Sequence, residues 1–529
     1  MLDQNIIWLA ADEPKNRYYL LPSMSNRHGL ISGATGTGKT TTLKVMIEGF
    51  SAAGIPTFVA DVKGDLASLS LPGVHNPDMQ SRFERFGIDD WEYRAFPVQL
   101  WDIYEKYGMP VRATVSSMGP VMLSRLLGLS DAQEGVLNVV FHIADDKGLK
   151  LIDLKDLNAT LQYVYEHRDE YRAEYGNVAS VSVSTIQRIL LQLRDQGGDI
   201  FFGEPELDIE DWIRTDENGY GVVNLLHSAS LIQKPQMYSM FLLWMLGELF
   251  NKLPEVGDTE KPKIVFFFDE AHLLFKNAPA ALVDKIEQVV KLIRSKGVGV
   301  FFCTQSPSDI PDAVLAQLSN RVQHALRAYT PNDRKTVKAA ADGFRQNPEL
   351  DLVSAITELK TGEAIVSFLQ EDGSPTVANR VFILPPQSKF GTVNDEKRRE
   401  LIESSPLREK YADPYDPVSA YEVLTGKAES QDEEPEEEPE SQYAPGSMEY
   451  ELEQIQKRKA EMALEKERVK LEREKEKLEQ EKAKLAEQKK KSKKKSSSAA
   501  KKVWNTALNT TTRNLTNRLI RGILGNLFK

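Results

Sequence analysis

The sequence contains a single cysteine, Cys303, among its 529 residues. One thiol excludes an internal disulfide and fits a reducing compartment, so we expect a cytoplasmic protein. No apolar run approaches the roughly 18 residues that indicate a membrane-spanning helix. The first residues carry no basic segment and reach an acid at Asp3, which is not the pattern of a signal peptide.

Acidic residues outnumber basic ones over most of the chain. Residues 489–529 hold twelve Lys and Arg and no acid, so the net charge of −11 leaves about −23 for residues 1–488. An acidic body with a basic tail excludes a protein that coats nucleic acid with its whole surface, and any such contact must be local. A chain of this length predicts two or more domains with linkers.

The stretch Gly33–Thr40 reads Gly-Ala-Thr-Gly-Thr-Gly-Lys-Thr and matches the phosphate-binding pattern G-x-x-x-x-G-K-[ST]. It follows an apolar strand pattern, residues 28–32, and precedes a helical pattern, residues 41–50. In such a loop, backbone N–H groups and the helix N-terminus face one anion. This context disfavours the alternative of a glycine-rich turn with a coincidental lysine. We assign nucleotide binding to Gly33, Ala34, Thr35, Gly36, Thr37, Gly38, Lys39, Thr40 and Thr41, with Lys39 on the β- and γ-phosphates and Thr40 on Mg²⁺.

Polar residues end three further predicted strands. Residues 56–60 end at Asp61, residues 263–268 end at Asp269 and Glu270, and residues 298–304 end at Gln305. Parallel strands place such ends at the ligand-binding edge of an open α/β sheet. Asp269 suits Mg²⁺, Glu270 suits the general base for the attacking water, and Gln305 suits a hydrogen bond to the γ-phosphate or that water. Asp61 is a further catalytic candidate, with a turn cap as its alternative role.

The acid after Asp269 and an extra strand between the loop and this acidic strand favour the ATPase branch of P-loop proteins. The guanine signature N-K-x-D is absent from the sequence, so ATP is the expected nucleotide. Such sites usually take an arginine from a neighbouring subunit. Arg294 is our first candidate, although a helix C-terminus also favours a cation there, and Arg321 is the second.

Residues 269–272 spell Asp-Glu-Ala-His, which invites comparison with superfamily-two helicases. The sequence has neither the Ser-Ala-Thr motif after it nor a later Q-x-x-G-R-x-G-R. A superfamily-two helicase is therefore disfavoured.

We predict an α/β fold of the ASCE, RecA-like P-loop kind, with a mainly parallel sheet and an inserted helical subdomain. Order should weaken beyond Ser404, and residues 429–440 hold eight acids and two prolines. Leu464, Leu471, Leu478 and Leu485 lie seven apart, as in a charged helix or weak coiled coil. The basic C-terminal segment suits a membrane surface, nucleic acid, a protein partner or packing on its own body. The expected divisions are the core 1–115, the insertion 116–215, the core 216–390, a linker 391–447, a charged helix 448–488 and a basic tail 489–529.

These motifs, in this order, resemble the HerA/FtsK superfamily of ring-forming ATPases, and within it the bacterial HerA-like proteins of the YjgR type. The residues that carry the resemblance lie at 31–41, 61–65, 268–272, 294–299 and 304–307. The resemblance implies a homo-hexameric ring, double-stranded DNA in its pore, and Arg294 as the finger that acts on a neighbour's site. We therefore expect a Mg²⁺-dependent ATP hydrolase that moves along DNA. The alternative is an ATP-dependent switch or scaffold that recruits protein partners or membrane through its C-terminal tail.

Overall fold

A single sheet runs through the described part of the chain, which in this computed structural model comprises residues 2–12, 16–75, 77–88, 90–257, 259–276 and 278–426. Within these ranges the sheet has thirteen strands in the order β1-β2-β13-β12-β11-β4-β10-β9-β5-β8-β6-β7, with β3 paired to β2. Every pairing from β11 to β7 is parallel, and the rest are antiparallel. The strands are β1 Leu2–Asp3, β2 Ile6–Ala11, β3 Arg17–Leu20, β4 Gly29–Ser32, β5 Thr57–Asp61, β6 Val98–Asp102, β7 Met109–Pro110, β8 Val223–His227, β9 Ile264–Phe268, β10 Val298–Thr304, β11 Asn320–Gln323, β12 Glu363–Ser367 and β13 Asn379–Ile383. The mainly parallel sheet confirms the predicted fold class.

The central strands are buried on both faces, as their continuous apolar sequences predict. Along β9, Phe266 and Phe268 belong to one apolar cluster, and Val265 and Phe267 belong to the other. The first cluster lies under α10 (Pro235–Lys252) and α12 (Ala280–Leu292), and the second lies under α1 (Lys39–Ala52). Successive side chains of a strand point to opposite faces of the sheet, so one continuous apolar run contributes to both apolar clusters.

One strand is shorter than its sequence pattern indicates. Residues 93–101, with their alternating apolar side chains, are typical of a strand over their whole length, but β6 begins only at Val98. The Arg94 N–H bonds to the Gln387 carbonyl and the Phe96 N–H to the Leu69 carbonyl, so this segment pairs with loops. Pro97 has no N–H with which to extend the ladder.

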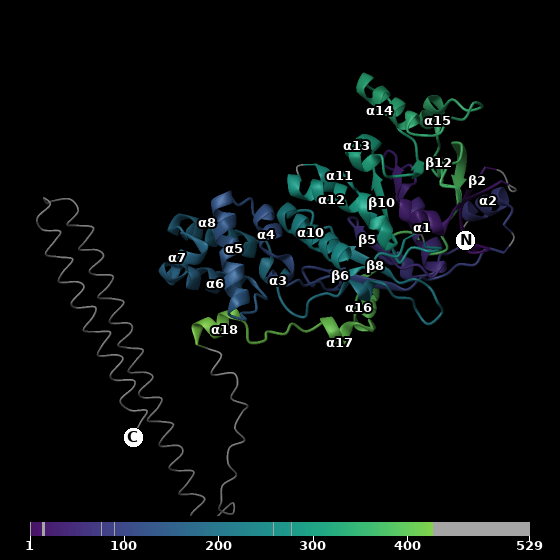
Figure 1. Ribbon diagram of the computed structural model, residues 1–529. Coiled ribbons are helices and arrows are strands. Elements are labelled where there is room, and N and C mark those ends of the chain that lie inside the picture. The colour runs from purple at the N-terminus through teal and green to yellow at the C-terminus, as the bar shows by residue number, and fades with distance from the viewer. Residues whose placement is uncertain are drawn as a thin grey trace, which may run out of the picture. The chain divides into compact units, whose positions relative to one another are not determined.

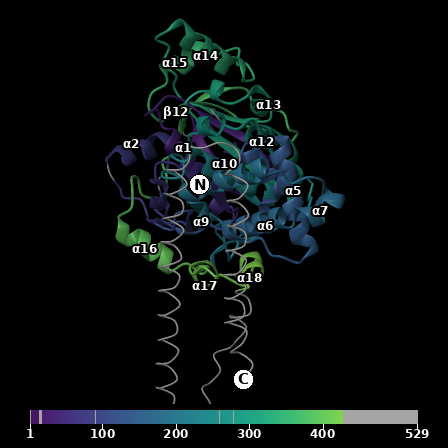
Figure 2. The ribbon, with the colours of Figure 1, turned by 90° about the vertical axis from the view of Figure 1, so that its left-hand side faces the viewer.

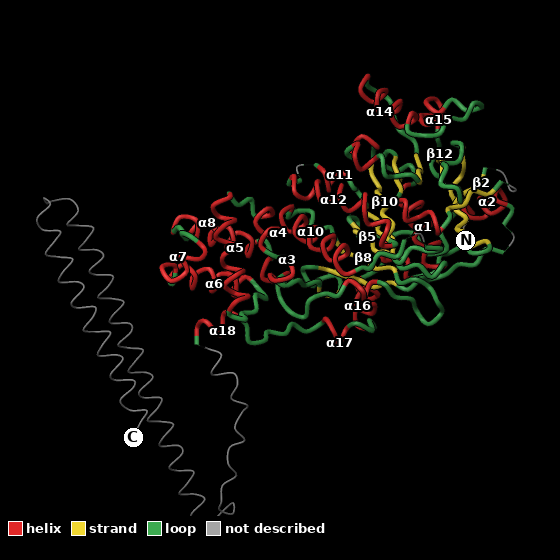
Figure 3. Tube along the Cα trace, viewed as in Figure 1, coloured by secondary structure: helices red, strands yellow, loops and turns green. Residues whose placement is uncertain are grey.

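The inserted helices gather at one end of the described chain, beside the strand-rich half (Figures 1 and 3). They lie between β7 and β8, in the interval predicted to be helical, and share one apolar cluster with α10. The helices are α3 Val115–Met118, α4 Pro120–Leu126, α5 Asp131–Asp146, α6 Leu154–Glu166, α7 Arg168–Tyr175, α8 Ser180–Asp195 and α9 Gly198–Phe201.

A smaller helical lobe follows β11 and rises above the sheet (Figures 1 and 2). It consists of α14 (Pro331–Asp342) and α15 (Leu352–Glu358), which enclose their own apolar cluster with Ala325 and Ile365. The remaining core helices are α2 Pro77–Phe86, α11 His272–Phe275 and α13 Asp312–Leu315.

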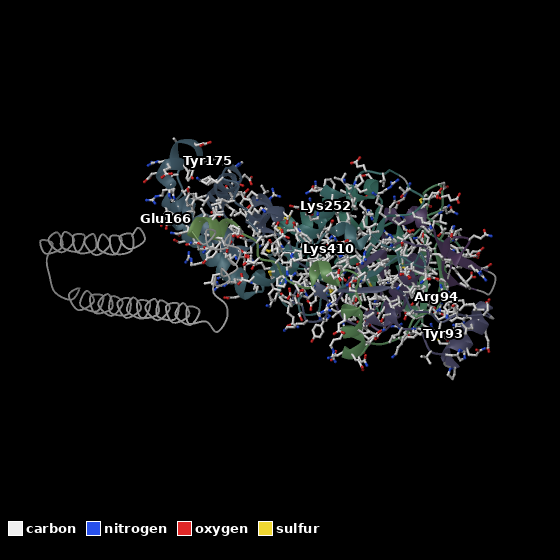
Figure 4. All side chains as sticks on the ribbon, turned by 90° about the horizontal axis from the view of Figure 1, so that it is seen from below. Tyr93, Arg94, Glu166, Tyr175, Lys252 and Lys410 are labelled. Carbon is white, nitrogen blue, oxygen red and sulfur yellow. The ribbon has the colours of Figure 1, made fainter. Side chains whose placement is uncertain are left out.

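Residues 385–426, here termed the C-terminal strap, include the described part of the predicted linker, 391–447, and they form helices beyond Ser404, where order was expected to weaken. They contain α16 (Asp395–Glu403), α17 (Arg408–Tyr411) and α18 (Ala420–Thr425). Tyr411 and Ala420 are buried, and α18 packs on α6 of the insertion. Seen from below, Lys410 of the strap lies between the insertion, marked by Tyr175, and the far end, marked by Tyr93 (Figure 4).

The predicted acidic segment, charged helix and basic tail lie outside the described residues. Among the described residues, no helix is long and apolar enough to cross a membrane.

Candidate active site

The loop predicted to bind phosphate connects β4 to α1. The Gly33 N–H bonds to the Thr304 carbonyl (3.3 Å), and the Ala34 N–H bonds to the Ala325 carbonyl (2.8 Å). A Cβ on Gly33 would come within 2.5 Å of the His324 Cβ. Gly38 has φ 118°, a left-handed conformation that suits glycine. Both ends of the loop therefore require glycine, one for space and one for conformation.

Lys39 is the first residue of α1 and is almost fully buried. Its ammonium donates to the carbonyls of Gly33 (2.6 Å) and Ala34 (3.1 Å). The same loop opens a pocket of about 300 Å³, lined by Thr35, Gly36, Gly38, Lys39, Thr40, Thr41, Lys63, Glu270 and Thr361. Loop, lysine and pocket thus lie where a nucleotide's phosphates would enter.

The acidic residues come together at the carboxyl ends of β5 and β9. Ala60 pairs with Phe268, which places Asp61 and Asp269 at neighbouring strand ends. Both oxygens of Asp61 accept backbone N–H groups, from Gly64 (2.7 Å) and Leu66 (3.2 Å). This is the turn-capping role that the sequence left as an alternative for Asp61. Burial, together with the Asp65 charge, raises the pKa of Asp61 to about 7.

Glu270 stands at the centre of a small polar cluster. Its Oε1 lies 2.9 Å from Lys63 Nζ, and its Oε2 lies 3.5 Å from both Gln305 Nε2 and His272 Nδ1. Its backbone has φ 48°, a positive value that residues other than glycine seldom adopt. Burial alone would raise the pKa of Glu270, but Lys63, with Gln305 and Lys39, lowers it below its ordinary value. Glu270 is therefore an anion at neutral pH and is paired with a cation.

Lys63 has a place in this cluster that was not predicted from the sequence. It lies in the turn after β5, and its ammonium also lies 3.5 Å from Asp269 Oδ2. The only sequence signal was its place in the turn from Asp61 to Asp65, and nothing there indicated a partner on β9.

His324 is a second residue without an earlier assignment, and it lies beneath the phosphate-binding loop. Its Nε2 lies 2.8 Å from Thr42 Oγ1, and its Nδ1 lies 2.9 Å from the Glu363 carbonyl. Burial lowers its pKa to about 4, and the Lys39 charge acts in the same direction. The ring is thus a neutral spacer between β11, β12 and α1.

The two candidate arginines both lie away from the phosphate pocket. Arg294 belongs to a 3₁₀ turn, Ile293–Lys296, just before β10 begins. The seven residues of β10 separate it from Gln305, a length of about 23 Å at the usual rise per residue. The Arg321 guanidinium donates to the carbonyls of Leu315, Leu318 and Gly343. Arg321 therefore holds its own subunit together, and neither arginine reaches its own subunit's site.

The donor set fits Mg²⁺ bound together with a nucleotide. Among the described residues, no group of three or more His, Cys, Asp or Glu side chains could hold a metal ion. Thr40 lines the pocket, and Asp269 lies beside it, 3.5 Å from the pocket-lining Lys63, so both offer oxygen ligands; Mg²⁺ is ordinarily held by one or two such groups plus phosphate oxygens. Metal binding here would depend on the nucleotide.

Comparisons with known proteins agree with this geometry. The model of the family described as "Helicase HerA-like C-terminal" matches residues 7–529. The chain is 28% identical over 117 residues to the DNA double-strand break repair helicase HerA of Sulfolobus acidocaldarius, covering 22% of this chain and 22% of that protein. It is 22% identical over 355 residues to the probable helicase MJ1565 of Methanocaldococcus jannaschii, covering 65% and 60%. The chain thus spans less than two thirds of the length of these curated relatives.

Among solved structures, the chain is similar to the bacterial conjugative coupling protein TrwBdeltaN70, with a TM-score of 0.46 and 15% identity over 73% of this chain and 90% of the other. It is also similar to VirB4 of Thermoanaerobacter pseudethanolicus, with a TM-score of 0.45 and 13% identity over 73% and 97%. The family match covers nearly the whole sequence, and the loop, acidic strand end and intervening strand lie as a P-loop ATPase requires. The chain belongs to the HerA-like helicase C-terminal family of P-loop ATPases.

Proposed function

We propose that this protein is a Mg²⁺-dependent ATP hydrolase that works as a ring-forming motor on double-stranded DNA. The observation that carries the hydrolase part is the meeting of Lys39, Glu270 and Gln305 at one edge of the sheet. Lys39 and the loop would bind phosphates, and Glu270 could accept a proton from a water molecule. Gln305 lies close enough to Glu270 to hold the same water.

Each residue has a separate task in this proposal. Lys39 leaves the carbonyls of its own loop and neutralises the β- and γ-phosphates. Thr40 and Asp269 would hold Mg²⁺, which when bound would supply positive charge to the transferred phosphoryl group. Glu270 orients and deprotonates the attacking water, because its low pKa keeps it ionised. Hydrolysis by such sites depends mainly on positioning and charge stabilisation.

The proposal that several subunits assemble into a ring is supported by the position of Arg294. A hydrolytic site of this type gains about 10³–10⁵ in rate from an arginine supplied by a neighbouring subunit. Arg294 lies at the opposite edge of the sheet from its own phosphate pocket, so it suits a neighbour's site. A head-to-tail contact of this kind closes into a ring when the rotation between subunits allows it.

The DNA substrate is supported by the family and by its relative in Sulfolobus acidocaldarius, which is named a DNA double-strand break repair helicase. A motor on duplex DNA hydrolyses ATP faster when DNA is present. ATPase rates of the purified protein should therefore be measured with and without linear duplex DNA, and rates that DNA leaves unchanged would refute the DNA proposal.

Two variants assign the hydrolysis to this site. Lys39→Ala should abolish nucleotide binding, because the phosphates lose their main cation. Glu270→Gln should keep binding but lower turnover about 10²–10⁴-fold, the usual contribution of a general base. Glu371→Gln changes an exposed acid on a distant turn and serves as the matched control. Normal turnover by Glu270→Gln would exclude Glu270 as the base.

A further inference from the structure

Lys63 makes the closest charged contact with Glu270, the residue assigned as general base. Its ammonium lies between two carboxylates, 2.9 Å from Glu270 and 3.5 Å from Asp269. It also lines the phosphate pocket, together with the loop residues that would bind the nucleotide. The Lys63 ammonium therefore lies beside Glu270, the proposed base, and Asp269, the proposed Mg²⁺ ligand, and it borders the pocket proposed for the phosphates.

The backbone of Lys63 is fixed while its side chain has room to turn. Asp61 holds the turn through the Gly64 and Leu66 N–H groups, and Arg398 of the strap donates to the Gly64 carbonyl at 3.3 Å. The Lys63 side chain is 42% exposed, whereas that of Asp269 is 5% exposed. A change of partner thus requires rotation of the lysine side chain alone.

The charges around Lys63 depend on what the pocket contains. In the structure, the charges of Asp65, Asp269 and Glu270 act on its ammonium, and Lys39 lines the same pocket. Mg²⁺ would neutralise Asp269, and a γ-phosphate would bring new anionic oxygens into the pocket. A cation moves toward the stronger field of opposite charge, and a half-exposed ion pair resists such an exchange weakly.

We propose that Lys63 senses the γ-phosphate: it holds Glu270 while the γ-phosphate position is empty, and transfers to the γ-phosphate when ATP binds. The transfer frees Glu270 Oε1 for the attacking water. After hydrolysis and phosphate release, Lys63 returns to Glu270. The base is thus engaged with water only when a γ-phosphate is present. This inference rests on the proposed ATP-hydrolysing function of the same site.

Nucleotide binding tests the transfer without any turnover. A non-hydrolysable ATP analogue and ADP, each with Mg²⁺, are titrated into wild-type protein, Lys63→Met and Lys63→Arg. Lys63→Met should bind the analogue about tenfold more weakly and ADP within about twofold of wild type, because only the analogue offers a γ-phosphate. Lys63→Arg keeps the charge and should restore most of the difference. Lys335→Met, at an exposed lysine of α14, is the matched control.

Equal changes in the affinities for analogue and ADP would overturn the proposal, since Lys63 would then act on the fold or the loop. Unchanged affinities for both would overturn it as well.

The two proposals fail in different ways. If the wild-type protein hydrolyses no ATP, the proposed function fails, while the two titrations still decide whether Lys63 recognises a γ-phosphate. If the wild type is an active ATPase and Lys63→Met retains its preference for the analogue, the inference about Lys63 fails alone.

Discussion

At the scale of single residues, His324 connects the phosphate-binding loop to the sheet without carrying a charge. A Cβ on Gly33 would meet the His324 Cβ, a Cβ on Gly38 would lie 3.4 Å from the ring, and the ring bonds to Thr42 of α1. Protonation would place a second positive charge close to Lys39 in a buried position, which is unfavourable. The loop therefore rests on a group that must remain neutral.

This neutrality predicts a pH-dependent stability. The pKa of His324 is about 4 in the folded state and 6.5 unfolded, so its contribution is complete above pH 6.5 and is lost as the pH falls toward 4. The free energy of unfolding should fall by about 2 kcal/mol between pH 7 and pH 5 on this account. Urea unfolding at both pH values should show a smaller decrease in His324→Gln than in wild type.

Comparing the variant with wild type cancels the contributions of other titrating groups to the pH dependence of stability. Buried His28 also lowers stability as the pH falls, whereas Asp61, with its raised pKa, increases it. An equal decrease in both proteins would show that His324 does not titrate as proposed.

The residues of the site were predictable to different degrees. Lys39, Asp269 and Glu270 lie in motifs whose spacing along the chain already reflects their chemistry. Lys63 and His324 were missed because their roles come from contacts across the sheet, with β9 in one case and with α1 and β12 in the other. Only the pairing of the strands brings those partners together.

At the scale of elements, the C-terminal strap connects the nucleotide-binding half to the helical insertion. Glu48 of α1 accepts the N–H groups of Gln387 and Ser388, and Asp156 of α6 accepts the Ser419 hydroxyl and the Tyr421 N–H. Between these ends, Tyr411 packs edge-on against Trp101, with ring centroids 5.7 Å apart. The strap thus contacts both α1 of the nucleotide-binding half and α6 of the insertion.

Two tyrosines of the strap provide a matched test of its contribution. Tyr411 is 1% exposed and its hydroxyl accepts the Asp208 N–H, whereas Tyr415 is 66% exposed. Tyr411→Ala should lower the free energy of unfolding by about 3–5 kcal/mol, through lost burial and the cavity that remains. Tyr415→Ala should change it by less than about 0.5 kcal/mol. Urea denaturation measures both, and equal stabilities would show that the strap contributes little.

The strands of the sheet were predictable from the sequence, and the strap was not. β9 and β10 are continuous apolar runs, the pattern of parallel strands covered on both faces. The strap has few apolar residues at irregular spacing, and much of its attachment comes from polar groups such as Ser405, whose hydroxyl bonds to Gln99. Such contacts leave no periodic signal in a sequence.

At the scale of the whole molecule, the basic tail separates the motor proposal from its alternative. A scaffold that recruits partners or membrane through the tail should lose that binding when residues 430–529 are deleted, while its ATPase rate stays. A motor should retain DNA-stimulated hydrolysis after the same deletion, since the assigned catalytic residues and the residues that line the phosphate pocket all lie before residue 362. Co-sedimentation with anionic vesicles, together with ATPase rates, distinguishes the two, and unchanged binding after deletion would leave the tail without the role proposed for it.

The ring itself can be tested by mixing two inactive proteins. Arg294→Ala subunits keep an intact hydrolytic site but supply no finger, whereas Glu270→Gln subunits supply the finger but have no base. Each protein alone should be nearly inactive. In an equal mixture, about a quarter of the interfaces pair an intact site with an intact finger, so about a quarter of the wild-type rate should return.

Mixing Glu270→Gln with the double variant Glu270→Gln/Arg294→Ala offers no complete interface and is the control. Normal hydrolysis by Arg294→Ala alone would assign the finger to another residue. No recovery in the mixture would show that the site is completed within one subunit, which the position of Arg294 before β10 argues against.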